Sequence, residues 1–152
     1  MLWKSELPFG CVVAPGHDLA KRKTISMLEV AAHPIALQSK ALPIRRYLDT
    51  RHGWLFTDGQ KMVKTNSLQL VKILARSGNY VAFASELDAA PEILAGSLVF
   101  LPVRDKGAEP QTVSIAVDGH KPLSKIAKIV ADRLTLGIAE DLKVVRKARA
   151  AA

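Results

Sequence analysis

The sequence predicts an α/β protein built around a parallel sheet, and the stretch from residue 61 to residue 85 carries most of this prediction. It reads as strand, helix and strand, because an apolar stripe at helical spacing lies between two short extended runs. The hydroxyl and amide side chains of Thr65-Asn66-Ser67 can cap the helix, and Gly78 can end it. The run from Tyr80 to Ala84 is almost wholly apolar, as in a strand covered on both faces. Strands joined in this way lie parallel, with a right-handed crossover.

The composition favours an aliphatic core and no membrane span. Apolar residues make up 49% of the 152 residues and aromatic residues only 5%, so one domain or two small lobes can bury aliphatic side chains. No apolar run approaches the ~20 residues that cross a bilayer, and the first residues lack the apolar segment of a secretion signal. Cys11, the single cysteine, lies in an apolar run, which predicts a buried, inert thiol in a reducing compartment. We therefore expect a cytoplasmic protein without membrane contact.

The net charge of +8 favours contact with nucleic acid. The 22 Lys and Arg residues are scattered, however, with only two local clusters, at 21–23 and 143–149. Aromatic residues are not interleaved with them, and no recognition-helix pattern is present. We interpret both clusters as solvated surface.

The elements before the organising stretch follow from local signals. Residues 9–14 read as a strand, and Pro15-Gly16-His17 closes it as a turn with His17 at the surface. Ser26 and Glu29 form a capping box for a short helix that ends before Pro34. Residues 35–38 are the next strand and 42–51 a second helix, and Asp58-Gly59 marks a loop.

The elements after the organising stretch are less regular. Residues 86–95 predict one or two helical turns, 98–103 a strand, and 104–110 a charged turn that could link two lobes. A last strand spans 113–117, and a final helix begins near Pro122 or Ser124. This helix is expected to bury Ile126, Ile129, Val130 and Leu134. Beyond residue 138 the chain is polar and rich in alanine, and we expect it to fray.

An ordered series of segments resembles a known family. The segments are 14–20, 25–29, 33–37, 65–72, 78–83, the strand 98–103 and the helix that follows Pro122-Leu123-Ser124. Over about residues 9–138 the chain resembles the effector-binding domain of LysR-type transcriptional regulators, which has the fold of the type 2 periplasmic binding proteins. The resemblance implies a three-layer αβα lobe with a partial second lobe.

The resemblance also implies departures from the family pattern. Neither the winged helix-turn-helix nor the linker helix of the family is visible in these 152 residues, and the first half of the first lobe has no counterpart. We therefore expect a truncated domain, in which contact with DNA belongs to a helix-turn-helix outside this chain. The expected parts are 1–23, partial first lobe; 24–103, second lobe; 104–140, returning strand and helix of the first lobe; and 141–152, polar tail.

The resemblance implies a sensor that binds a small, anionic effector between two lobes. Carried over by position, the second lobe contributes Gln38, Ser39, Thr65, Asn66 and Ser67. The physical properties of these residues agree, because donors at the carboxyl ends of parallel strands and at a helix N-terminus bind ligands and anions. Two alternatives stay open: Asn66 and Ser67 only cap the helix, and Gln38 and Ser39 form an ordinary polar loop.

Other function classes have weaker support. The sequence has no Gly-x-Ser-x-Gly, no glycine-rich phosphate loop, no paired histidines at metal spacing and no partnered cysteine. We therefore expect no enzyme, no catalytic residues, no metal and no cofactor. The alternatives are a solute-binding protein of the same fold and a basic nucleic-acid-associated module. We also expect the chain to form a dimer, because a partial lobe leaves apolar faces uncovered, including Cys11, Val13, Ile115 and the Ile126–Val130 stripe.

Overall fold

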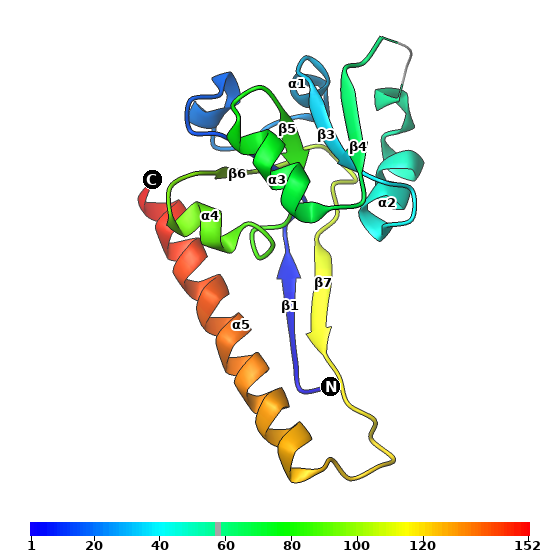
Figure 1. Cartoon of the computed structure of the whole chain (residues 1–152), viewed down its shortest axis with the longest axis vertical. Coiled ribbons are helices and arrows are strands. Elements are labelled where there is room, and N and C mark those ends of the chain that lie inside the picture. The colour runs from blue at the N-terminus through cyan, green and yellow to red at the C-terminus, as the bar shows by residue number, and fades with distance from the viewer. Residues whose placement is uncertain (57–58) are drawn as a thin grey trace.

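A five-stranded sheet lies at the centre of the computed structural model, which describes residues 1–56 and 59–152 (Figure 1). Its order is β4-β3-β5-β2-β6. The three strands β3, β4 and β5 are parallel, and β2 runs antiparallel to its neighbours β5 and β6. The strands are β2 (Gly10–Val13), β3 (Ile35–Gln38), β4 (Met62–Thr65), β5 (Val81–Phe83) and β6 (Val99–Pro102).

Helices cover both faces of this sheet, so the predicted three-layer αβα lobe is confirmed. One face packs against α1 (Met27–Ala31), α2 (Pro43–Arg51) and the short 3-10 helices η1 (Asp18–Lys21) and η2 (Gly53–Leu55). The other face packs against α3 (Leu68–Arg76) and α4 (Ala90–Leu94). Side chains alternate between the two faces, as a strand requires: in β2, Cys11 and Val13 face the first layer and Val12 faces the second.

The structure confirms the predicted capping box at the start of α1 and the glycine at the end of α3. Ser26 and Glu29 form the capping box, with the Ser26 hydroxyl accepting from the Glu29 amide at 3.2 Å. Gly78 follows α3 with φ of +89°, in the region that favours glycine. Of the predicted Asp58-Gly59 loop, Asp58 lies outside the described residues.

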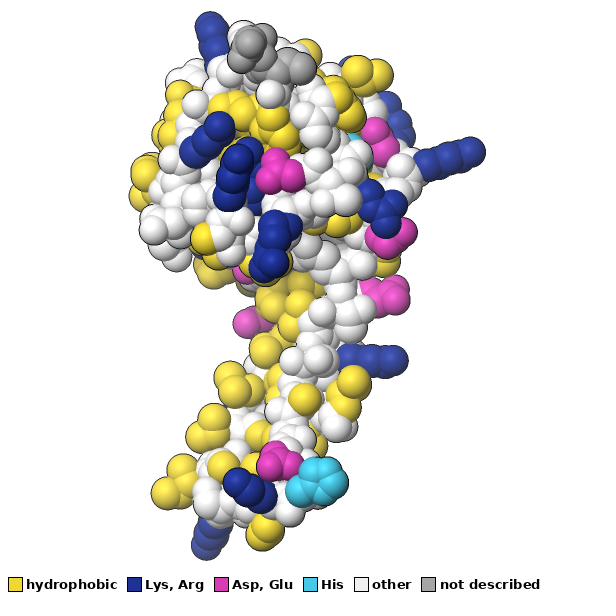
Figure 2. Space-filling model, turned by 90° about the vertical axis from the view of Figure 1, so that its right-hand side faces the viewer, with side chains coloured by type: hydrophobic (Ala, Val, Ile, Leu, Met, Phe, Trp, Pro, Cys, Tyr) yellow, Lys and Arg dark blue, Asp and Glu magenta, His cyan; other side chains and the backbone are white. Residues whose placement is uncertain are grey.

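A ribbon and a long helix extend away from the sheet (Figure 1). The ribbon pairs β1 (Trp3–Leu7) with β7 (Gln111–Ile115) in antiparallel register, Trp3 opposite Ile115. The helix α5 (Lys125–Ala151) runs alongside the ribbon and returns to the sheet beside α4 with its C-terminal end. Hydrophobic side chains are spread over this narrow part of the molecule (Figure 2).

The strand at residues 9–14 lies in a different place from the predicted one. We expected it in the partial first lobe, but β2 pairs with both β5 and β6 inside the five-stranded sheet. All four residues of β2 are buried. A strand that is apolar on both faces needs a layer of helices on each side, and only the five-stranded sheet provides both.

The end of the chain also corrects a prediction. The polar tail at 141–152 does not fray but continues α5 to Ala151. Leu142 and Val145 are buried, and Arg146 and Arg149 both pair with the carboxylate of Glu86. Alanine, lysine and arginine are strong helix formers, and the contact with Glu86 fixes the last turns.

His17 is a third correction, because it is buried and not at the surface. Its Nδ1 accepts from the Leu19 amide at 3.1 Å and so caps η1, and its ring lies 4.7 Å from that of His33. Burial, and then the neighbouring His33, hold the pKa of His17 below its usual value. Cys11 is buried, as its apolar run predicted, and burial raises the pKa of its thiol, which keeps it protonated and unreactive. The expectation that Cys11 and Val13 lie on an uncovered face of the partial lobe is wrong, because both are fully buried in the five-stranded sheet.

Candidate functional site

The predicted site residues meet at one edge of the five-stranded sheet. Gln38 and Thr65 end the neighbouring parallel strands β3 and β4 and lie directly opposite each other. The Ser39 amide donates to the Thr65 carbonyl at 2.9 Å, which continues the pairing one residue beyond the strands. Asn66 and Ser67 follow immediately, before α3 begins. All five predicted residues therefore belong to the carboxyl ends of two adjacent parallel strands, where open α/β sheets bind ligands.

The start of α3 is a capped helix N-terminus. The Ser67 hydroxyl accepts from the Leu70 amide at 3.2 Å, and the Thr65 hydroxyl accepts from the Ser67 amide at 3.1 Å. The helix has nine residues and no acidic residue in its first turn. The partial positive charge of its N-terminus is therefore not offset by a carboxylate of that turn.

Gln38 is a buried side chain and not part of a polar loop. Only 4% of its surface is exposed, and its Nε2 donates to the Phe83 carbonyl at 2.7 Å. This bond ties the end of β3 to the end of β5. Its Oε1 is buried and has no partner among the residues that the structure describes. Ser39 and Thr65 are partly exposed, and Asn66 is exposed.

The caps predict different effects for two adjacent substitutions. Ser67→Ala removes the side chain that caps α3 and is expected to lower the free energy of unfolding by about 1 kcal/mol. Asn66→Ala alters an exposed side chain that is not the cap, so its effect should stay within about 0.5 kcal/mol. Urea unfolding of both variants checks the assignment; a larger loss for Asn66→Ala would mean that Asn66 holds the helix start.

The end of β5, which lies beside the end of β3, is followed by a buried carboxylate that pairs with two arginines of α5. Glu86, three residues after β5, is fully buried. Its Oε1 accepts a hydrogen bond from Nε of Arg146 at 2.8 Å, and its Oε2 accepts one from Nη1 of Arg149. Nη2 of Arg146 also donates to the Glu6 carbonyl at 2.7 Å, and the Arg149 guanidinium lies 4.6 Å from the centre of the Phe100 ring. These contacts, which we call the Glu86 clamp, join β5, β1 and α5. The sequence signal for this clamp is the pair Arg146 and Arg149 at helical spacing three, and the prediction that this basic cluster is solvated surface is wrong for these two residues.

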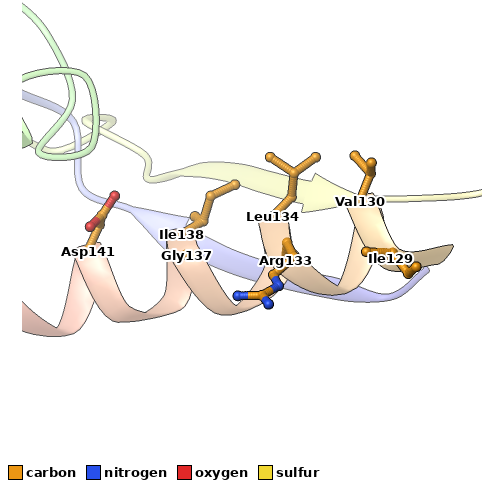
Figure 3. A pocket seen from close by; sticks show the side chains of 7 residues that line it. All are labelled: Ile129, Val130, Arg133, Leu134, Gly137, Ile138 and Asp141. Atoms are coloured by element: carbon orange, nitrogen blue, oxygen red, sulfur yellow. The ribbon is translucent and has the colours of Figure 1, made fainter. Parts of the chain in front are cut away.

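A groove of about 410 Å³ lies on α5 and not at the predicted edge (Figure 3). It is lined by Ile129, Val130, Arg133, Leu134, Gly137, Ile138 and Asp141. The sequence predicted Ile126, Ile129, Val130 and Leu134 to be buried, but they are 75%, 53%, 50% and 51% exposed. The helical period was right, but the face of α5 that packs on the rest of the chain is the one with Ala131, Leu142 and Val145.

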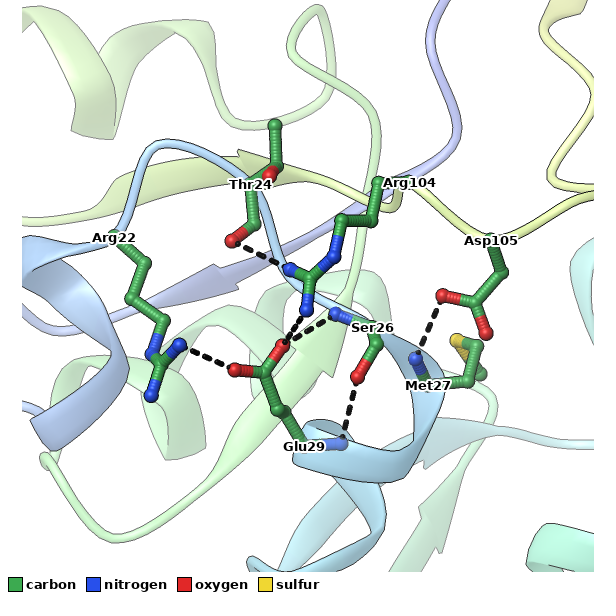
Figure 4. A network of polar contacts seen from close by, with 7 residues as sticks. All are labelled: Arg22, Thr24, Ser26, Met27, Glu29, Arg104 and Asp105. Carbon is green, nitrogen blue, oxygen red and sulfur yellow. Dashed lines mark hydrogen bonds and ion pairs between the residues drawn. The ribbon is translucent and has the colours of Figure 1, made fainter.

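A third cluster of polar groups is structural (Figure 4). Glu29 pairs with Arg22 at 2.5 Å and with Arg104 at 2.9 Å. Oδ1 of Asp105 accepts from the Met27 amide at 3.0 Å. Ser26, which caps α1, donates its amide to Glu29 at 2.7 Å. The cluster fastens the segment after β6 to the start of α1, and the charge of Glu29 is satisfied within it.

The described part of the chain has neither a cluster of metal ligands nor a helix that could span a membrane. Across residues 1–56 and 59–152, His, Cys, Asp and Glu side chains do not gather in groups of three or more that could hold a metal ion. Within the same residues, none of the helices combines the length and the hydropathy that a membrane crossing needs.

The fold is shared with solved regulatory proteins. The structure matches HinK, a LysR family transcriptional regulator from Pseudomonas aeruginosa, with a TM-score of 0.57 and 13% identity over 90% of this chain and 47% of that one. It matches the effector-binding domain of QuiR in complex with shikimate with a TM-score of 0.58 and 15% identity, over 90% of this chain and 66% of that one. It matches the BenM effector-binding domain with its effector benzoate with a TM-score of 0.55 and 14% identity, over 72% of this chain and 52% of that one. The chain thus spans about half the length of HinK.

These likenesses show that the chain shares the fold of the QuiR and BenM effector-binding domains. The sequence itself matches the family model of the LysR substrate binding domain over residues 5–136. The chain therefore belongs to the LysR substrate-binding domain family. No curated protein is significantly similar to it in sequence.

Proposed function

We propose that this chain is the ligand-sensing part of a LysR-type transcriptional regulator and that it binds a small anionic effector at the carboxyl ends of β3 and β4. The observation that carries the proposal is the N-terminus of α3, capped by Ser67 and without an acidic residue in its first turn. Amide groups and a partial positive charge at such a terminus favour an anion. The shikimate of the QuiR complex and the benzoate of the BenM complex are both carboxylates, which agrees with this chemistry.

Each predicted residue has a distinct role in this proposal. The hydroxyls of Thr65 and Ser67 hold the turn in which the amides of α3 begin. The exposed Asn66 and the partly exposed Ser39 offer polar groups to the effector at the rim. Gln38 is buried and bonded to the Phe83 carbonyl, so it fixes the spacing of β3 and β5 beneath the effector. The domain regulates in this account and does not catalyse.

A charge reversal at the helix start tests the site. Ser67→Asp keeps a good capping group but places a negative charge where the anion would bind. A ligand at 100 times its Kd stabilises the folded state by about 2.7 kcal/mol, which raises Tm by roughly 5–10 °C in a chain of this size. We expect benzoate or sulfate to raise the Tm of the wild type and not that of Ser67→Asp.

A matched control separates the site from a general effect of charge. Ser124 caps α5 as Ser67 caps α3, with its hydroxyl 3.1 Å from the Ala127 amide. Ser124→Asp therefore makes the same change at another helix and should leave the response to anions intact. Equal stabilisation of the wild type and Ser67→Asp would place the anion site elsewhere.

The proposal extends to partners and location. The domain would act as a pair of copies, in the cytoplasm where a transcriptional regulator meets DNA. Its contact with DNA would come from a helix-turn-helix that these 152 residues do not include. The uncovered apolar stripe on α5 supports pairing, because exposed apolar patches of this kind favour association.

A further inference from the structure

The turn after β2 is closed by a buried histidine that accepts a hydrogen bond. His17 is 8% exposed, and its Nδ1 accepts from the Leu19 amide at 3.1 Å, which caps η1. An imidazole nitrogen accepts only while it carries no proton, so this bond requires the neutral ring with its proton on Nε2. Protonation of Nδ1 would remove the acceptor and set one N–H group against another. The bond therefore exists in one protonation state of His17 only.

Among the described residues, two titratable side chains face the His17 ring. The ring of His33, which lies just before β3, has its centre 4.7 Å from that of His17, at an interplanar angle of 58°. Asp18 is exposed at the start of η1. Burial and then His33 disfavour a charge on His17, and the weaker attraction of Asp18 favours one, so the pKa of His17 lies below its ordinary value. His17 therefore takes up a proton more readily when its ring leaves this position.

The segment that His17 caps links β2 to α1. Leu19 is buried in the core of the first helical layer. The His17 carbonyl accepts from the Ala20 amide at 2.9 Å, and the Leu19 carbonyl accepts from the Arg22 amide at 3.1 Å. The Arg22 side chain pairs in turn with Glu29, which belongs to the capping box of α1. Loss of the cap at His17 would therefore loosen η1 and the connection that it makes to α1.

We infer that His17 and His33 form an acid-sensitive latch, in which protonation of His17 releases η1 from the core while the five-stranded sheet stays folded. The latch lies where β2 ends and β3 begins, because β2 runs antiparallel to β5 and β3 runs parallel to it. Gln38 and Thr65 lie at the opposite ends of their strands. The latch is therefore separate from the proposed effector site.

The direction of the pH dependence follows from the lowered pKa of His17. The open state binds a proton more tightly than the closed state, so acid favours opening. The stability that the latch contributes is fully present above the pKa of a free histidine, about 6.5. It is lost as the pH falls from that value toward the lower pKa of the closed state.

Amide hydrogen exchange, followed by NMR and corrected for the intrinsic exchange rate, tests the latch in the whole chain. In the wild type, the protection factor of the Leu19 amide is expected to fall about fivefold or more between about pH 7 and pH 5, relative to that of Val12. Val12 is fully buried in the middle of the sheet and reports on opening of the sheet itself. In His17→Asn the fall should stay within about twofold, because asparagine caps a helix but does not titrate. His33→Gln removes the second imidazole and should move the fall to higher pH.

A matched control removes a histidine from another part of the chain. His120 is exposed, and His120→Asn should leave the fall at Leu19 as it is in the wild type. A wild-type Leu19 amide whose protection relative to Val12 does not change with pH overturns the latch, and so does an equal fall in His17→Asn. Equal losses at Leu19 and Val12 would show that acid opens the whole sheet, for example through the buried His52, and would overturn a local release of η1.

Discussion

Replacing Arg146 and Arg149 together by methionine is expected to lower the free energy of unfolding by about 3–5 kcal/mol, because a buried carboxylate then loses its partners. The side chain of Glu86 is fully buried, whereas those of Arg146 and Arg149 are 44% and 25% exposed. The arginines can return to water when they lose the carboxylate, but Glu86 cannot when it loses the arginines. The effect should therefore exceed that of removing Glu86 itself.

A third substitution separates loss of charge pairing from loss of packing. Glu86→Leu, added to the double variant, removes the unpaired charge and is expected to recover part of the lost stability. Urea unfolding of the wild type, the double variant and the triple variant gives the three free energies. A triple variant that is no more stable than the double variant would mean that the Glu86 clamp stabilises through the bulk of the arginines and not through their charge.

Gly10→Ala is expected to lower the free energy of unfolding by about 3 kcal/mol, at the upper end for overpacking of a core. A Cβ at residue 10 would lie 2.6 Å from the Leu101 carbonyl oxygen and 2.5 Å from Cζ of Phe100. The carbonyl is backbone and cannot rotate away, and β2 is held between β5 and β6. The strands β2 and β6 must therefore separate to admit a single methyl group.

The matched control is a glycine-to-alanine substitution at Gly119, where an added methyl group has no neighbours. A Cβ at Gly119 would meet no atom within 4 Å, so Gly119→Ala should change the free energy of unfolding by less than about 0.5 kcal/mol. Thermal or urea unfolding of the two variants compares them directly. Similar stability of both would show that β2 and β6 adapt without strain.

The candidate site could be predicted from the sequence because its signals are local. The cap at Ser67, the glycine after α3 and the apolar strand at 81–83 lie within one strand-helix-strand stretch, and parallel pairing then brings Gln38 beside Thr65. The place of β2 could not be predicted in this way. Its partners are 70 to 92 residues away in sequence, and its own four residues do not say which sheet they join.

The two ends of the chain were misread for a related reason. Trp3–Leu7 has three successive polar residues between two apolar ones, so it lacks the alternation that would predict a strand. Its partner β7 lies more than 100 residues later. The basic residues of α5 look solvated until Glu86, 60 residues earlier, is known to be buried beneath Arg146. Long-range pairing of a buried charge leaves no periodic pattern for a sequence to display.

The Glu86 clamp holds α5 to the rest of the molecule near the C-terminal end of the helix. The helix is held near Arg146, beside the end of β5, while its first residues project along the ribbon (Figure 1). From Arg146 to Lys125 the helix is about 30 Å long, so a rotation of about 10° at the clamp moves its far end by about 5 Å. The direction of the whole helix, and with it the position of its first turns, therefore depends on the contacts of Glu86 with Arg146 and Arg149.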